Sequence, residues 1–149
     1  MTIIERIADE LARISPETTI YTENQPNGFD EPCFFISRAG NAVLKPELFD
    51  YETRKIPFQI VYFPPEKNAN EALDEMEALL MDNLTVLPDF AYLRNREFSV
   101  DTSEHTLTCD FDLVLRMYKP DSSLKQRSLD LNARTNARTN ARTKGNNRE

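Results

Sequence analysis

Glycine is scarce in this sequence, which has only three glycines among 149 residues. Loops that bind phosphate need glycine because it lets backbone N–H groups approach the anion closely, and the patterns GxxxxGK[ST] and GxGxxG are both absent. The chain also has one histidine, two cysteines and no tryptophan. These shortages exclude the common nucleotide-binding motifs and leave few residues for nucleophilic or acid–base catalysis.

Long apolar runs are missing as well. No stretch of eighteen apolar residues occurs, so we expect no membrane-spanning segment. The apolar pattern at the N-terminus is interrupted by Glu5, Asp9 and Glu10, whereas a secretory signal peptide has a basic start and an uninterrupted apolar core. We therefore expect a protein that is not exported through such a signal, with one modest hydrophobic core.

Positive charge is scarce outside the C-terminal part of the chain. The chain has 18 basic and 25 acidic residues. Seven of the basic and three of the acidic residues lie at positions 121–149, which leaves 11 basic and 22 acidic residues at positions 1–120. The body therefore carries a net charge of −11 and the tail +4. A body with this charge repels phosphates instead of releasing their counterions, so we do not expect it to bind nucleic acid.

The hydrophobic pattern predicts two helices. Apolar residues recur at helical spacing over residues 3–14, and Ser15-Pro16 ends that segment. A second apolar stripe leads to Leu84, with Asn68 or Asn70 as the N-cap and Glu71 at the spacing of a capping box. Alternating or β-prone segments predict strands over residues 18–22, 33–37, 42–44, 51–63, 92–100 and 107–117.

If residues 42–44 continue the strand that starts at Cys33, the order of these elements is α-β-β-β-α-β-β, which indicates an α+β fold. Short connections between neighbouring strands favour a mainly antiparallel sheet, with two helices packed on one face. Pro57 lies inside the strongest strand signal and suggests an edge position or a bulge. We predict that this domain occupies residues 1–120 and that residues 121–149 form a separate basic low-complexity tail.

The tail contains three copies of Asn-Ala-Arg-Thr between Asn132 and Thr143. It has no apolar stripe with which to bury its own surface, so we expect it to be disordered when it has no partner. Two interpretations remain open: a solubilising repeat, or an arm that lies on the acidic body of a neighbouring subunit. The arginines of such an arm would be Arg134, Arg138 and Arg142.

Cys33, in the stretch GFDEPCFFI, is the first candidate for catalysis. A nucleophilic thiol needs a base, a cation or a helix N-terminus nearby, and the single histidine, His105, lies in or beside a polar turn. Cys33 sits among aromatic and branched residues, and Cys109 occupies the apolar side of an alternating strand. We therefore interpret both as buried structural thiols.

Paired carboxylates are the second candidate. Asp110 and Asp112 lie two residues apart on one strand and point the same way, about 7 Å from each other. A cation could bind between them, but a solvated face is the better explanation of the pair, and no converging cleft is indicated. The sequence predicts no catalytic residue, no cofactor and no metal site.

Three quoted stretches resemble a known family. They are TIYTENQPNGFDEPCFFIS, RKIPFQIVYFPPEKNANEALDEMEALL and HTLTCDFDLVLRMYKP, taken in this order after an N-terminal helix. Over residues 1–120 the pattern looks like the small tail terminator proteins of long-tailed phages and phage-derived contractile particles. The repeat tail departs from that pattern.

The resemblance implies a structural virion protein in the tail and neck, assembled in the host bacterial cytoplasm. It implies a homohexameric ring on the end of the tail tube that halts polymerisation and contacts neck or connector proteins, and sheath protein in a contractile tail. DNA would pass through the lumen without specific binding, which favours an acidic inner wall. Candidate interface residues are Asp30, Glu31, Asp101 and Glu104, together with the three tail arginines.

Three other hypotheses remain. The first, of similar class, is another neck or head–tail completion protein. The second is a small thiol- or carboxylate-dependent enzyme that uses Cys33 or His105. The third is a nucleic-acid-binding adaptor that acts through the arginine repeat.

Overall fold

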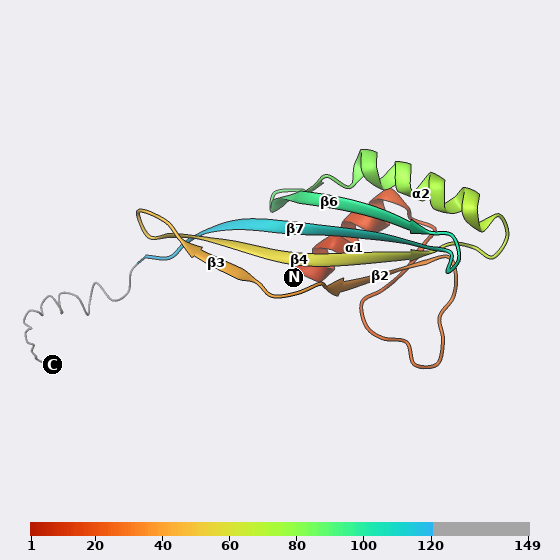
Figure 1. Ribbon diagram of the computed structural model, residues 1–149. Coiled ribbons are helices and arrows are strands. Elements are labelled where there is room, and N and C mark those ends of the chain that lie inside the picture. The colour runs from red at the N-terminus through yellow and green to blue at the C-terminus, as the bar shows by residue number, and fades with distance from the viewer. Residues whose placement is uncertain (121–149) are drawn as a thin grey trace, which may run out of the picture. The chain divides into compact units, whose positions relative to one another are not determined.

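The computed structural model describes residues 1–120 of the protein (Figure 1). The predictions made for the tail, including those for Arg134, Arg138 and Arg142, lie outside the described residues. The chain divides into two compact units. The larger contains residues 1–44 and 54–115, and the described part of the smaller contains residues 45–53 and 116–120.

The described residues contain two helices and seven strands. The helices are α1 (Ile3–Ile14) and α2 (Ala69–Asn83). The strands are β1 (Thr19–Tyr21), β2 (Cys33–Arg38), β3 (Val43–Pro46), β4 (Tyr51–Phe63), β5 (Val86–Leu87), β6 (Ala91–Asp101) and β7 (Thr106–Tyr118). The two-residue strand β5 was not predicted, because two residues are too few to show alternation.

Helix α1 begins with a capping box that the sequence analysis did not identify. The hydroxyl of Thr2 accepts the N–H of Glu5 at 3.1 Å, and the Glu5 carboxylate accepts the N–H of Thr2 at 2.7 Å. These two bonds satisfy donors that a helix start leaves free. Ile7 and Leu11, four residues apart, are fully buried and anchor the helix in the core.

Helix α2 starts differently from the prediction. Asn68 is the N-cap, but it has left-handed backbone geometry (φ 60°) and its side chain makes no capping hydrogen bond, so the capping box predicted for Asn68 and Glu71 is wrong. The left-handed backbone changes the direction in which the cap side chain leaves the chain. The predicted apolar stripe is correct, since Leu73, Met76 and Leu80 are buried.

The sheet has the strand order β1-β2-β4-β7-β6-β5, and β3 pairs with β4. β1 runs parallel to β2, while the β2–β4, β5–β6 and β6–β7 pairs are antiparallel. The predicted α+β class with a mainly antiparallel sheet and two helices is therefore confirmed. Figure 1 shows α1 and α2 on the same side of the sheet.

Two prolines lie at positions where the sheet tolerates them. Pro57 comes directly before Phe58, whose pair with Arg38 is the last between β2 and β4, and its carbonyl accepts the N–H of Ala39 at 3.0 Å. The edge position suggested for Pro57 is wrong, because β4 lies between β2 and β7. Pro46 is the last residue of β3. Proline is tolerated at strand edges because only its missing N–H has to be accommodated.

The core lies between the helices and one face of the sheet. Along β7, Leu107, Cys109, Phe111 and Leu113 are buried, and they alternate with half-buried polar residues on the other face. The core cluster also contains the following residues of the helices and the other strands: Ile7, Leu11, Phe34, Ile36, Phe58, Ile60, Tyr62, Leu73, Met76, Leu80, Leu84, Leu87 and Leu93. The opposite sheet face is called the uncovered face below, because neither helix packs on it.

Candidate assembly surfaces

Cys33 is a buried thiol with an ordinary packing role. Its residue is 0% exposed. Burial, and then the negative charges of Glu31 and Asp30, raises the pKa of Cys33 to about 11. A thiol with a raised pKa is a poor nucleophile at neutral pH, because the thiolate is the reactive form. The interpretation as a structural cysteine therefore agrees with the geometry.

Cys109 has the same character. It is 0% exposed in the core face of β7, and burial raises its pKa to about 12, although Arg96 acts in the opposite direction. His105, by contrast, is exposed in the β6–β7 turn with left-handed geometry (φ 54°). The described residues therefore offer no activated thiol.

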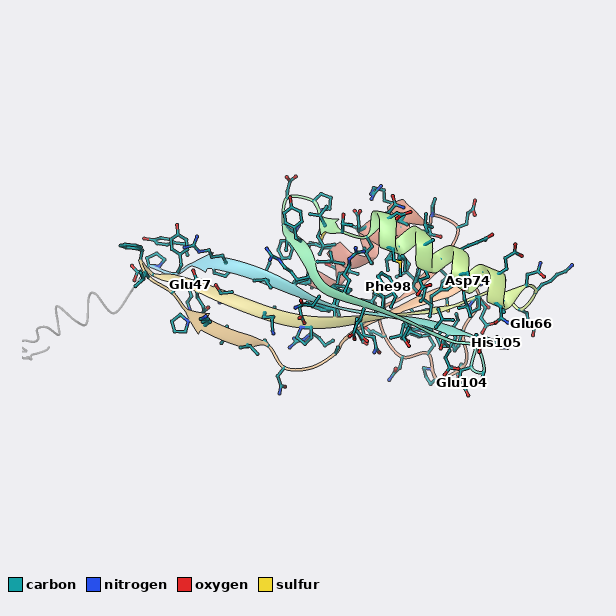
Figure 2. The ribbon with its side chains drawn as sticks, turned by 45° about the horizontal axis from the view of Figure 1, so that its top comes forward. Glu47, Glu66, Asp74, Phe98, Glu104 and His105 are labelled. Carbon is teal, nitrogen blue, oxygen red and sulfur yellow. The ribbon has the colours of Figure 1, made fainter. Side chains whose placement is uncertain are left out.

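Two of the predicted interface residues, Glu31 and Glu104, line one pocket. This pocket of about 600 Å³ lies at one end of the larger unit, where β4 ends, α2 begins and the β6–β7 turn comes close. Figure 2 shows Glu66, Glu104 and His105 gathered there, while Asp74 lies farther along α2. The lining is mainly acidic and polar: Glu31, Pro64, Pro65, Glu66, Asn68, Ala69, Asn70, Glu71, Glu104 and His105.

The other two predicted residues, Asp101 and Asp30, have local contacts. The Oδ1 atom of Asp101 accepts the N–H of Ser103 and of Glu104, both at 3.0 Å, and the Ser103 hydroxyl at 2.7 Å. These bonds lower the pKa of Asp101, the largest effect coming from the Glu104 N–H. The backbone N–H of Asp30 donates to the Tyr21 hydroxyl at 3.1 Å. The assignment of these residues to an interface stays a prediction.

The uncovered face of the sheet carries a polar centre. Gln59 of β4 donates to Asp110 of β7 at 3.0 Å, and Asn95 of β6 donates to Asp112 at 2.9 Å. Glu97 pairs across the strands with Asp110. Each aspartate thus has an amide partner, which explains the pair without a bound cation, and the described residues contain no group of three or more metal-ligating side chains.

At one edge, aromatic rings pack on the sheet face that the helices leave uncovered, and one of these rings comes from the loop between β1 and β2. Phe29 of this loop lies 5.0 Å from Phe35 and 4.8 Å from Phe63, centroid to centroid. Tyr21 stacks on Phe35 at 5.1 Å. Figure 1 shows the loop on the side of the sheet opposite the helices. The sequence pattern predicts a strand at Phe35, but it contains no signal that Phe29 folds back over it.

Membrane insertion through a helix finds no support in the described part of the chain. Neither α1 nor α2 has the length and apolar character that crossing a lipid bilayer requires. The two helices are amphipathic, each with buried residues on one side only.

Comparison with known proteins gives one family. The model of a family described as "Phage tail terminator protein" matches residues 2–125, a range that includes every helix and strand of the structure. A comparison with curated proteins gives no match.

Proposed function

Because this chain belongs to the phage tail terminator family, whose members are structural proteins of the phage tail, we propose that it forms a ring on the end of the tail tube. The ring stops further tube polymerisation and provides the surface to which the neck attaches. The observation that carries this proposal is the family match over residues 2–125. The ring is homohexameric, and in a contractile tail it also contacts the sheath.

A passive role agrees with the chemistry of the described residues. Both thiols are buried and their pKa values are raised to about 11 and about 12. The mainly acidic pocket has no buried charged residue among its lining side chains. The chain acts through shape and symmetry: each copy offers two different surfaces, and repetition of one heterologous contact closes a ring.

The uncovered sheet face is the surface that we assign to the lumen. It bears Glu97, Asp110 and Asp112 together with Arg94, which pairs in register with Asp112, whereas the opposite face is closed by the two helices. A negative wall lets DNA slide because it does not hold phosphates. The candidate interface residues Asp30, Glu31, Asp101 and Glu104 would extend this wall at the loops.

Deletion of the coding sequence tests the terminator role. Tails assembled without the protein should have uncontrolled lengths in electron micrographs, and heads should stay unattached. Complementation with the full chain should restore both tail length and head attachment. Tails of normal length that merely lack heads would overturn the terminator assignment and favour the alternative of a neck or connector protein.

Charge reversal on the uncovered face tests the lumen assignment separately. Asp110→Arg and Glu97→Arg should leave tail length unchanged but slow DNA delivery, because cations in the lumen hold phosphates. Asp74→Arg is the matched control, since Asp74 lies exposed on α2. Equal infectivity of the three variants would contradict the assignment of this face to the lumen.

A further inference from the structure

The tip of the β3–β4 hairpin presents two large apolar side chains to solvent. Leu48 is 77% exposed and Phe49 is 82% exposed. Both belong to the smaller unit, in the four-residue connection between β3 and β4. Exposed apolar side chains of this size, adjacent to each other, are typical of a contact surface and unusual in a plain loop.

The tip is held rigidly by polar and aromatic contacts within the smaller unit. The Arg116 Nε donates to Glu47 at 3.0 Å, and its guanidinium lies 4.1 Å from the centre of the Tyr51 ring. The Glu47 N–H donates to the Tyr51 carbonyl at 2.8 Å, and the Lys119 N–H donates to the Asp50 carbonyl at 2.7 Å. A braced tip loses little conformational entropy on docking.

The backbone at the tip is strained. Phe49 and Asp50 have φ values of 62° and 64°, in the left-handed region that glycine and asparagine adopt most easily. A bulky residue persists there only when the surroundings determine it, and such outliers gather at functional contacts. The two positive φ values belong to the central residues of the hairpin turn that the Tyr51 N–H closes on the Leu48 carbonyl at 3.4 Å, a turn in which glycine or asparagine is usual. The exposure of Phe49 is therefore the observation that indicates contact with a partner.

A groove on the larger unit has the apolar character that this tip needs. The groove has a volume of about 460 Å³, and its floor is formed by Ile3 and Ile4 of α1 and by Ile56 and Phe58 of β4. Arg38 stands at its rim, with its guanidinium 6.0 Å from the Phe58 ring centre. The other rim residues are Thr2, Glu5, Thr22 and Glu23.

We propose that Leu48 and Phe49 of one copy dock into this groove on a second copy of the chain. The proposal rests on the ring proposed above and names the contact that closes it. The rims are complementary in charge. Asp50 and Lys45 lie beside the tip, and the groove rim offers Arg38 as a partner for Asp50 and Glu5 and Glu23 as partners for Lys45.

This docking supplies an anchor and not the whole interface. A buried phenylalanine covers about 150–250 Å², whereas a stable protein–protein contact buries more than about 1,000 Å². Anchors of this kind sit in the centre of a contact and carry most of its affinity. The contact joins two different surfaces, so it is heterologous and can repeat around a ring.

Disulfide trapping between two separately tagged full-length variants tests the contact. Asp50→Cys in one chain, which keeps Leu48 and Phe49, and Thr22→Cys in the other place the thiols beside the tip and at the groove rim. The native thiols Cys33 and Cys109 are buried and should form no disulfide between copies, which oxidation of the unmodified chain verifies. We expect mild oxidation of the mixture to give a mixed-tag dimer at least tenfold above either variant alone.

The matched control replaces Thr22→Cys by Asp74→Cys, which lies exposed on α2 and outside the groove. Mixed dimers formed equally by the control pair, or by neither pair, would overturn the docking contact. Native mass measurement of the unmodified chain, alone and on tail tubes, distinguishes the two proposals. A ring without tip–groove trapping refutes only the docking, whereas tubes of normal length in the deletion strain refute the ring.

Discussion

At the scale of single residues, burial decides what the two cysteines do. Cys33 belongs to the uncovered face and Cys109 to the core face, yet both are 0% exposed and both have raised pKa values. The negative charges of Glu31 and Asp30 add to the effect at Cys33. Both thiols therefore stay protonated in the folded protein at pH values where an unfolded chain has lost the protons.

Because of this difference, the protein should become less stable as the pH rises into the alkaline range. An unfolded thiol ionises near its ordinary pKa of 9.0, while folded Cys33 ionises at about 11 and Cys109 at about 12. The unfolded state then binds fewer protons, so the free energy of unfolding falls as pH rises above about 9. Urea unfolding at about pH 8 and pH 10 should show this loss. The Cys33→Ala/Cys109→Ala variant should show a shallower loss, and an equal one would contradict the assignment.

The sequence correctly predicts burial at residues where it follows from the alternating pattern of a single strand. Cys109 alternates with polar neighbours, so its burial follows from the pattern alone. Prediction from sequence fails at Asn68, because the left-handed backbone that prevents side-chain capping depends on how the chain turns after Pro65. The stretch around Phe49 was not identified either, since exposure of an apolar residue leaves no periodic signal.

At the scale of elements, one arginine connects the strand β6 to the end of helix α2. The Nη1 atom of Arg96 donates to the carbonyls of Leu80, Met81 and Leu84 at 3.2, 3.1 and 3.0 Å. These carbonyls lie at the negative end of the helix dipole, and the carbonyl of Leu80 also accepts the N–H of the C-cap residue Leu84 at 2.8 Å. Arg96 follows Asn95 in a β-bulge of β6, where the extra residue redirects the strand.

Arg96→Met should therefore destabilise the fold by about 2 kcal/mol, because hydrogen bonds to charged groups contribute about 1.5–3 kcal/mol. Arg94→Met is the matched control, because Arg94 is exposed on the uncovered face and should change stability by less than about 0.5 kcal/mol. Urea unfolding followed by circular dichroism measures both. Equal effects of the two variants would show that Arg96 does not hold the helix end.

The hairpin tip gives a prediction in which stability and assembly change in opposite directions. Phe49→Asn places a residue that tolerates left-handed backbone at φ 62°, so the free energy of unfolding should rise by about 0.5–1 kcal/mol. Assembly should weaken because the apolar anchor is lost. Leu48→Asn is the control, since its backbone is outside that region: it should weaken assembly without stabilising the fold. Urea midpoints and native mass report the two effects.

The pairing of elements was only partly predictable. The six longer strands and both helices follow from apolar periodicity, so their existence and order were predicted. The parallel pairing of β1 with β2 was not, because a three-residue strand carries no signal of direction. Among the candidate interface residues, only Glu31 and Glu104 are brought to one pocket, and that proximity depends on a fold that joins positions far apart in sequence.

At the scale of the whole molecule, charge opposes the association of copies. Residues 1–120 carry 11 basic and 22 acidic residues, so bodies with a net charge of −11 repel one another at low ionic strength. The proposed contact is apolar at its centre, and salt screens the repulsion more than it weakens such a contact. The whole chain should therefore assemble better in salt.

Raising sodium chloride from about 0.05 M to about 0.5 M, where the Debye length falls from roughly 14 Å to roughly 4 Å, should increase the assembled fraction of the full-length protein. Sedimentation velocity measures this fraction, with Phe49→Asn as the control that should not respond. A decrease with salt would indicate that ion pairs, and not an apolar anchor, dominate the contact between copies.

The parallel pairing of β1 with β2 has a consequence for how related chains can diverge. After a parallel neighbour the polypeptide has to travel back along the sheet before the next strand starts, and residues 22–32 make this return. Three paired residues span only about 10 Å, whereas eleven residues reach roughly 36 Å. The surplus length bends Phe29 back over the sheet. A change in the length or composition of residues 22–32 leaves every hydrogen bond between the strands in place. Family members can therefore adapt this loop to different neighbours at little cost to folding.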